Sequence, residues 1–277
     1  MANVTGGMDT KAHFLDMKRQ GRPIAVLTAY DFPTAKAEAT AGVDLILVGD
    51  SVGTNLLGYA SEQEVRLEDI VHHVRAVRRG APQTPILADL PYRTYETTDA
   101  AVANAQVLRA AGADMVKFEG ARPDIAAALA AAGIAVCGHL GLEPQTHTDK
   151  RLRGRTAEEA ARLLNDAVAL DKAGIAMLVL ELIPEEVAAR LARAIAAPTI
   201  GIGAGRFTDG QVLVVTDLLG LTGTRFRHNR RYADLAPLIE TAVSDYVRDV
   251  RSHAFPTAAN SFAMPKDARL AFESSDG

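Results

Sequence analysis

The chain has 277 residues, 48% of them hydrophobic and 23% charged, and 30 Lys+Arg against 34 Asp+Glu give a formal net charge of −4. This composition excludes a disordered, collagen-like or coiled-coil chain, and the lack of a basic excess argues against a nucleic-acid binder. The one cysteine, Cys137, excludes an intrachain disulfide and a cysteine-based zinc site, and it suits a reducing cytoplasm.

No stretch of about 18 uninterrupted apolar residues predicts a membrane helix, so we expect no membrane partner. Residues 1–10 lack the basic-then-apolar pattern of a signal peptide, and we expect them to form a short flexible lead-in. A helix is predicted next, at residues 11–20.

After that helix, apolar runs of strand length alternate with alanine-rich helical segments. The predicted strands are residues 24–30, 44–50, 85–91, 114–120, 135–141, 176–183, 198–205 and 211–218. The helical segments include residues 67–80, 97–112, 124–133, 156–174 and 184–195. Continuous apolar runs suit strands that are buried on both faces of a parallel sheet.

About eight strand–helix units in a chain of this length predict an α/β fold, a single-domain TIM (β/α)8 barrel over residues 1–255. An open doubly wound sheet is the alternative. We expect the helix at 11–20 to plug the N-terminal end of the barrel and a last helix, at 233–253, to close the ring of helices. Residues 206–210 leave no room for a helix in the seventh unit, and residues 256–277 are predicted to be a partly disordered tail.

Charged and polar residues gather where several predicted strands end. They are Asp50, Ser51, Asp89, Lys117, Glu119, His139 and Glu181. In a TIM barrel these C-terminal strand ends form the active site. Four carboxylates suit a hard divalent cation such as Mg²⁺, whereas one histidine without a cysteine suits zinc less well. A metal at Asp50 and Asp89 would bind a 2-oxo acid and stabilise its enolate, while another carboxylate removes the proton next to the carbonyl.

Several short motifs follow one another in a fixed order along residues 10–255, and some of them contain these charged and polar residues. They include Val48-Gly49-Asp50-Ser51-Val52-Gly53, Ala88-Asp89-Leu90-Pro91-Tyr92, Val116-Lys117-Phe118-Glu119-Gly120, Gly138-His139-Leu140-Gly141-Leu142 and Ile200-Gly201-Ile202-Gly203-Ala204-Gly205. With these motifs the chain resembles the ketopantoate hydroxymethyltransferases. The resemblance implies a homodecamer of TIM barrels that moves a hydroxymethyl group from 5,10-methylenetetrahydrofolate to 2-oxoisovalerate (3-methyl-2-oxobutanoate) in pantothenate biosynthesis.

The resemblance also implies roles for the residues at the strand ends. Asp50 and Asp89 match the Mg²⁺ ligands, and Glu119 matches a metal-site carboxylate that acts through water. Ser51 and Lys117, with Asp50 and Asp89, would hold the 2-oxo acid. Glu181 matches the general base, and His139 matches a residue that lines the site.

Three loops beyond the strand ends depart from the family pattern. They are residues 58–66, 148–155 and 225–231, and the last two are rich in arginine. The departures leave open a relative that hydroxymethylates a different 2-oxo acid. A folate-independent carbon–carbon lyase of the phosphoenolpyruvate mutase/isocitrate lyase type and a non-catalytic assembly protein are further alternatives. The lyase would need a Lys-Cys-Gly-His motif, and Val136-Cys137-Gly138-His139 lacks its lysine.

Overall fold

The predicted barrel is confirmed. The computed structural model describes residues 9–147, 149, 151–223 and 226–274, and eight parallel strands close into a barrel in chain order. The strands are β1 (Ile24–Thr28), β2 (Leu45–Val48), β3 (Ile86–Asp89), β4 (Met115–Lys117), β5 (Ala135–Gly141), β6 (Met177–Glu181), β7 (Thr199–Ile202) and β8 (Gly210–Leu213). The closed order rules out the open doubly wound sheet, in which two strands would lie at free edges.

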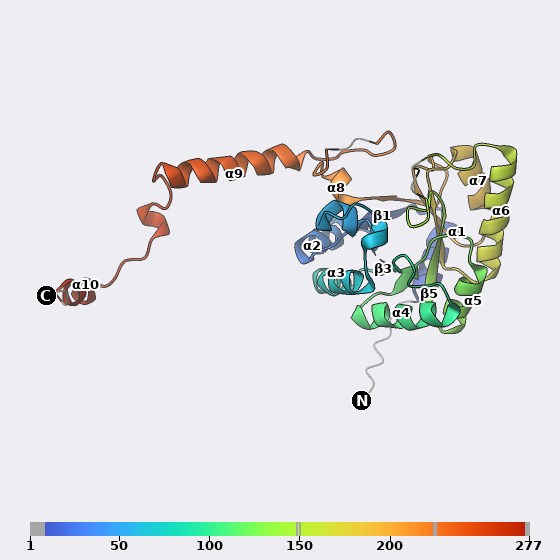
Figure 1. The fold of residues 1–277 in the computed structure, drawn as a ribbon, viewed down its shortest axis with the longest axis horizontal. Coiled ribbons are helices and arrows are strands. Elements are labelled where there is room, and N and C mark those ends of the chain that lie inside the picture. The colour runs from blue at the N-terminus through green and yellow to red at the C-terminus, as the bar shows by residue number, and fades with distance from the viewer. Residues whose placement is uncertain (1–8, 148, 150, 224–225, 275–277) are drawn as a thin grey trace, which may run out of the picture.

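Helix α1 (Thr10–Arg19) precedes the first strand, and further helices cover the outside of this barrel (Figure 1). They are α2 (Phe32–Ala41), α3 (Leu67–Gly80), α4 (Thr98–Ala111), α5 (Pro123–Ala131), α6 (Ala157–Lys172) and α7 (Glu185–Ala194). Thr97 and Thr156 cap α4 and α6 by accepting backbone N–H bonds, as Ser and Thr side chains do at helix starts. As expected, no helix separates β7 from β8 in this part of the chain, and β8 leads into the short helix α8 (Val215–Leu218).

Helix α1 fills the N-terminal end of the barrel, as predicted. Phe14 and Met17 are buried and belong to one cluster with inward strand residues such as Leu45 and Met115. Lys18 fastens the helix by donating to the carbonyls of Ala192, Ile195 and Ala197. The floor of the barrel is therefore closed and apolar, and a larger apolar cluster packs the helices onto the outside of the strands.

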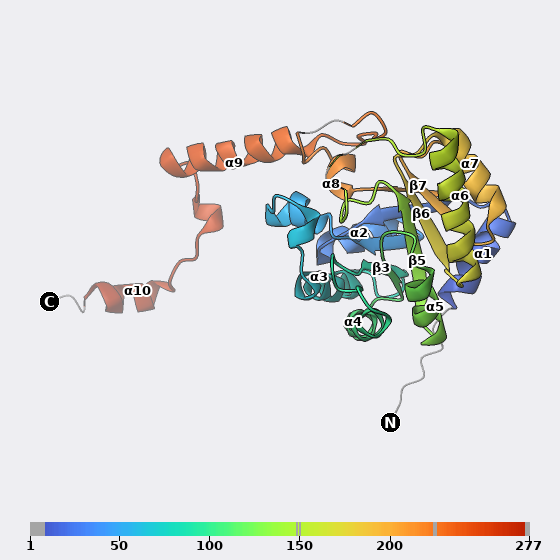
Figure 2. The ribbon, with the colours of Figure 1, turned by 45° about the vertical axis from the view of Figure 1, so that its right-hand side comes forward.

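The last long helix does not close the ring of helices, so that prediction was wrong. Helix α9 (Leu235–Arg251) has no buried residue and extends away from the barrel (Figures 1 and 2). Its exposed side chains include Leu238, Ile239, Val243 and Tyr246. An apolar pattern at helical spacing predicts the helix but does not say what covers its apolar face.

Beyond α9 the chain forms a 3-10 turn (Ala258–Asn260) and helix α10 (Lys266–Glu273), farther from the barrel than α9 (Figure 2). Residues 256–274, which belong to the segment predicted to be partly disordered, are exposed throughout. Of the flexible lead-in predicted at residues 1–10, residues 1–8 lie outside the described residues, whereas Asp9 caps α1 and Thr10 is its first residue. None of the helices in the described ranges is long and apolar enough to span a bilayer.

Candidate active site

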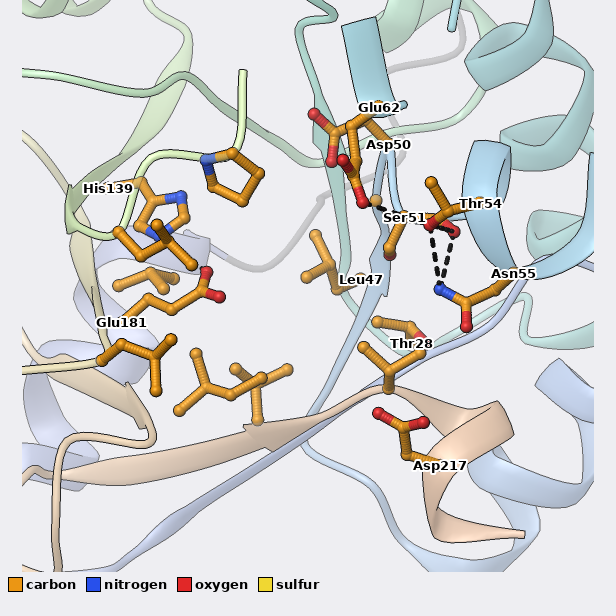
Figure 3. A pocket seen from close by; sticks show the side chains of 18 of the residues that line it. Thr28, Leu47, Asp50, Ser51, Thr54, Asn55, Glu62, His139, Glu181 and Asp217 are labelled. Atoms are coloured by element: carbon orange, nitrogen blue, oxygen red, sulfur yellow. Dashed lines mark hydrogen bonds and ion pairs between the residues drawn. The ribbon is translucent and has the colours of Figure 1, made fainter. Parts of the chain in front are cut away.

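The seven predicted residues all line one cavity at the C-terminal ends of the strands. The cavity has a volume of about 630 Å³, and its lining includes Asp50, Ser51, Asp89, Lys117, Glu119, His139 and Glu181. Figure 3 shows His139 and Glu181 on one wall and Asp50, Ser51 and Glu62 on the wall across from them. The structure therefore brings together side chains that are up to 131 positions apart in sequence.

Strand alternation explains why charged residues line the cavity while the rest of the barrel interior is apolar. Side chains on a strand point alternately to its two faces, so Met115 and Lys117 point into the same interior. Cys137 and His139 follow the same rule on β5, and Met115 and Cys137 belong to the apolar floor. Strands β3, β4, β5 and β6 thus each contribute apolar residues to the floor and, two or four positions later, a charged or polar residue to the cavity.

Asp50 and Asp89 form a pair of buried carboxylates with one cation beside it. The Asp50 backbone N–H donates to Asp89 Oδ2 at 3.0 Å, and Lys117 Nζ lies 3.0 Å from Asp89 Oδ1. Burial, with the Asp89 charge adding to it, raises the pKa of Asp50 to about 7. Burial opposes charge on Lys117, but the nearby carboxylates outweigh it and raise the lysine pKa, so the ammonium stays charged.

Glycine at position 49 makes this close approach possible. A Cβ atom there would lie 3.1 Å from Ser51 Oγ and 3.3 Å from Asp89 Oδ2. Ser51 is itself held by Tyr30, whose hydroxyl lies 2.7 Å from Ser51 Oγ. A side chain at position 49 would press against Ser51 and Asp89, which are both expected to hold the substrate.

A second group joins two glutamates through one imidazole. His139 Nδ1 lies 3.3 Å from Glu119 Oε1, and His139 Nε2 lies 3.2 Å from Glu181 Oε2. Burial alone would lower the pKa of His139, but the two carboxylates overcome it and raise the pKa to about 9. Glu181 keeps 20% of its side chain exposed, whereas Glu119 and His139 are buried. Of the three residues, Glu181 is the one open to a substrate.

Gln145, which was not among the predicted site residues, is fully buried between these two groups. Its side chain donates to Asp50 Oδ2 at 2.7 Å, and its backbone N–H donates to Glu119 Oε2 at 2.9 Å. The Tyr95 hydroxyl donates to the Gln145 side-chain oxygen. No charge or motif in the sequence marks an uncharged amide in a loop, although Gln145 lies only three residues beyond the Gly-His-Leu-Gly-Leu motif.

Residues from the loop after β8 form the outer part of the cavity. Phe226, Arg227, His228 and Asn229 line it, and the rings of Phe226 and His228 stack with centroids 5.5 Å apart. Asn229 donates to Asp217, which is buried in the same wall. Burial lowers the pKa of His228, so its ring is neutral near pH 7.

Most of the arginines in the divergent loops do not contribute to the cavity. Arg151 and Arg153 pair with Asp149, and Arg231 pairs with Asp234. Within the described ranges, Arg227 is the one loop arginine that lines the cavity. Arg225 lies outside the described residues.

The oxygen ligands of Asp50 and Asp89 suit a hard cation, although these residues alone do not complete a metal site. In the described part of the chain, no three Asp, Glu, His or Cys side chains are arranged to hold a metal ion. Asp50 and Asp89 are nevertheless adjacent, and their mutual repulsion contributes to the raised pKa of Asp50. Two carboxylates completed by water and substrate oxygens are a common Mg²⁺ site, and a divalent cation would relieve that repulsion.

The fold and the site together define a barrel enzyme with a charged pocket above an apolar floor. Comparison with known proteins supplies the class of reaction. Residues 9–258 match the family model described as ketopantoate hydroxymethyltransferase. The chain therefore belongs to the ketopantoate hydroxymethyltransferase family and is a transferase.

Named relatives agree over nearly the whole chain. A 3-methyl-2-oxobutanoate hydroxymethyltransferase of Geobacillus kaustophilus is 44% identical, covering 95% of this chain and 98% of its own. The protein of that name from Roseiflexus sp. is 48% identical over 90% of this chain and 92% of its own. The one from Thermus thermophilus is 46% identical over 88% and 96%.

Solved structures that resemble the fold carry other activities. A phosphonopyruvate hydrolase complexed with oxalate and Mg²⁺ has a TM-score of 0.61 at 12% identity, covering 97% of this chain and 99% of its own. A 2,3-dimethylmalate lyase has a TM-score of 0.56 at 14% identity, covering 97% and 99%. At such identities the likeness shows the barrel fold alone.

Proposed function

We propose that this enzyme transfers a hydroxymethyl group from 5,10-methylenetetrahydrofolate to 3-methyl-2-oxobutanoate, forming ketopantoate for pantothenate biosynthesis in the cytoplasm. One observation carries the proposal: a carboxylate open to substrate, Glu181, lines the same cavity as the Asp50–Asp89–Lys117 group. The names of relatives that are 44–48% identical support the substrate assignment.

The 2-oxo acid is assigned to the buried end of the cavity. Lys117 supplies the positive charge for the substrate carboxylate, and Ser51 supplies a hydroxyl that Tyr30 already orients. Asp50 and Asp89 are assigned as Mg²⁺ ligands, with Glu119 acting through water. When bound, Mg²⁺ would supply Lewis-acid stabilisation of the negative charge that develops on the 2-oxo group.

Glu181 acts as the base in this proposal. Its carboxylate accepts the proton from C3, and the C–H electron pair forms the C2–C3 double bond of the enolate. C3 then forms a bond to the one-carbon unit of the folate. Since a methylene group becomes a hydroxymethyl group, one water supplies the oxygen and both carbon–nitrogen bonds to the folate break. The two folate nitrogens take up one proton from that water and one from Glu181, which returns to its carboxylate form. His139, 3.2 Å from Glu181, holds the base in place.

A different 2-oxo acid is the second candidate substrate, and the residues of the outer cavity wall support this candidate. Phe226, Arg227 and His228 belong to a loop that departs from the family pattern, and all three line the cavity. A mass-spectrometric screen of 2-oxo acids with methylenetetrahydrofolate and Mg²⁺ separates the candidates. If another acid is hydroxymethylated and 3-methyl-2-oxobutanoate is ignored, the first assignment is wrong.

No observation favours the lyase. Cys137, the residue that resembles part of the lyase motif, is buried in the apolar floor and does not line the cavity. Turnover of a 2-oxo acid without folate would nevertheless revive this candidate. Binding of Mg²⁺ without turnover of any 2-oxo acid would support a non-catalytic protein instead.

We further propose that the enzyme is a homo-oligomer, a decamer by its family. The support is the exposed apolar side chains of α9, which a single chain leaves uncovered. Exposed apolar surfaces of this kind mark interaction sites. Light scattering gives the mass directly, and a monomeric mass at micromolar concentration would refute the proposal.

The decisive test of the base is exchange of the substrate C3 proton. In D₂O with Mg²⁺ and no folate, the enzyme should catalyse deuterium uptake at C3 of 3-methyl-2-oxobutanoate, followed by NMR. Glu181→Gln should slow this uptake by about 10²–10⁴-fold, the range for removal of a general base. Glu186→Gln, an exposed glutamate on α7, is the matched control and should leave the rate unchanged. An unchanged rate in Glu181→Gln would remove Glu181 from this role.

A further inference from the structure

We infer that Gln145 is a positioning residue that holds the two acids Asp50 and Glu119 in their working orientation at the same time. The inference rests on the proposed function and goes beyond it, because Gln145 touches neither substrate nor metal in that proposal. It follows from the number and direction of the hydrogen bonds that this one residue makes.

Every hydrogen-bonding group of Gln145 is used. The side-chain nitrogen donates to Asp50 Oδ2 at 2.7 Å and to the Leu90 carbonyl at 3.1 Å. The side-chain oxygen accepts from the Tyr95 hydroxyl, and burial raises the pKa of Tyr95, so that hydroxyl remains a donor. With one fixed donor and two fixed acceptors around it, the amide has one satisfied orientation.

The backbone of Gln145 reaches the second acid. Its N–H donates to Glu119 Oε2 at 2.9 Å, while its carbonyl accepts from Gln63 Nε2 at 2.8 Å. Asp50 follows β2 and Glu119 follows β4, so they come from different strands of the barrel. Gln145 is the residue of the loop after β5 that fixes the orientation of both.

An uncharged donor suits this position better than a cation. Lys117 already neutralises Asp89 at 3.0 Å. The amide holds one oxygen of Asp50 in place without adding a positive charge, so it does not compete with a bound cation for that carboxylate. In metal sites, partners that orient a ligand in this way typically contribute 10–100-fold in metal affinity or activity.

The network also couples the loop after β5 to the acids. Gln145 is fully buried, whereas Thr146 and His147, which follow it in the chain, are less buried. Any displacement of this loop withdraws a hydrogen bond from Asp50 and from Glu119 together. Orientation of both acids therefore depends on the position of Gln145 in this loop.

The test compares two variants of Gln145 with a matched control. Gln145→Leu removes the amide, and Gln145→Glu keeps the size and the acceptor for Tyr95 but places an oxygen against Asp50 Oδ2. Gln63→Met is the control, because it removes a hydrogen bond to the same residue without touching an acid. Each protein is measured for Mg²⁺ binding by calorimetry, for C3 proton exchange in D₂O, and for thermal unfolding.

We expect both Gln145 variants to lose about 10–100-fold in Mg²⁺ affinity and in exchange rate, with Gln63→Met within about threefold of the unaltered enzyme. Should Gln145→Leu fail to fold, Gln145→Glu decides the question. Folded Gln145 variants with unaltered Mg²⁺ binding and exchange would overturn the inference. An equal loss of Mg²⁺ affinity and exchange rate in Gln63→Met would also overturn it, because the hydrogen bonds of Gln145 would then only hold the loop in place. If the unaltered enzyme itself neither binds Mg²⁺ nor exchanges the proton, the proposed function fails, and this inference fails with it.

Discussion

Glu38 on α2 is a buried carboxylate outside the active site, and replacing it should stabilise the protein. The residue is 6% exposed, and neither carboxylate oxygen has a hydrogen-bond partner among the described residues. Burial, reinforced by the charge of Asp31, raises the pKa of Glu38 from its ordinary 4.5 to about 8. At pH 7 the native side chain is therefore mostly protonated, whereas the unfolded one is ionised.

The size and sign of the effect follow from this difference. The native state binds the proton more tightly, so stability is highest below about pH 4.5 and falls as the pH rises toward 8. At pH 7 the loss is about 3 kcal/mol, at about 1.36 kcal/mol per pH unit above the unfolded pKa. Glu38→Gln does not titrate, so it should gain about 3 kcal/mol at pH 7 and less than about 1 kcal/mol at pH 5.

Urea unfolding at the two pH values measures this gain directly. Glu68→Gln, on the exposed surface of α3, is the control and should change stability by no more than about 0.5 kcal/mol at either pH. Exchange of the substrate C3 proton should be unaffected by either variant, since neither residue lines the cavity. A gain of the same size at pH 5 and pH 7, or a loss at pH 7, would refute the reasoning.

Three further substitutions test the barrel and its pocket. Lys117→Met leaves the buried Asp89 without its cation and should cost about 3–5 kcal/mol in urea unfolding at pH 7 without divalent cations; a cost below about 1 kcal/mol would contradict the buried pair. Phe14→Ala should cost about 3–5 kcal/mol by emptying the floor of the barrel, with exchange of the C3 proton retained, and a lost exchange activity would show that α1 does more than plug the barrel. Gly141 has a φ of 111°, and a Cβ there would lie 2.1 Å from the carbonyl oxygen of Glu181, so Gly141→Ala should lower both the melting temperature and the exchange rate; an active variant of unchanged stability would argue against this close approach.

The fold was largely predictable because its signal repeats along the chain. Every predicted strand is present, although most are shorter than their apolar runs. Within residues 114–120 only Met115–Lys117 form a strand. The predicted strand was too long because Glu119, in the loop that follows, still faces the cavity as a strand residue would. The eighth run, 211–218, is a strand and then helix α8, since a short apolar run does not distinguish a strand from a buried helix.

The charged part of the site was predictable for a related reason. Burying a carboxylate or a lysine at an inward position of a strand costs free energy unless the charge is paired or bound to a metal. Asp89 and Lys117 therefore stand out in the sequence. Gln145 did not stand out, because an amide in a loop is ordinary and its importance depends on the path by which the loop returns to the barrel. The packing of α9 was unpredictable as well, because none of its residues is buried against the part of the chain that the structure describes.

Because α9 leaves the barrel, the residues of the pocket and those of the exposed carboxyl-terminal arm occupy separate parts of the sequence. Every residue that lines the cavity lies before Leu235, and every described residue from Leu235 onward is partly or fully exposed. An isolated helix of 17 residues is only marginally stable in water without tertiary packing. Helix content should therefore rise with protein concentration, while the geometry of the pocket stays the same. Selection can thus alter the carboxyl-terminal arm of the chain without disturbing the residues that perform the chemistry.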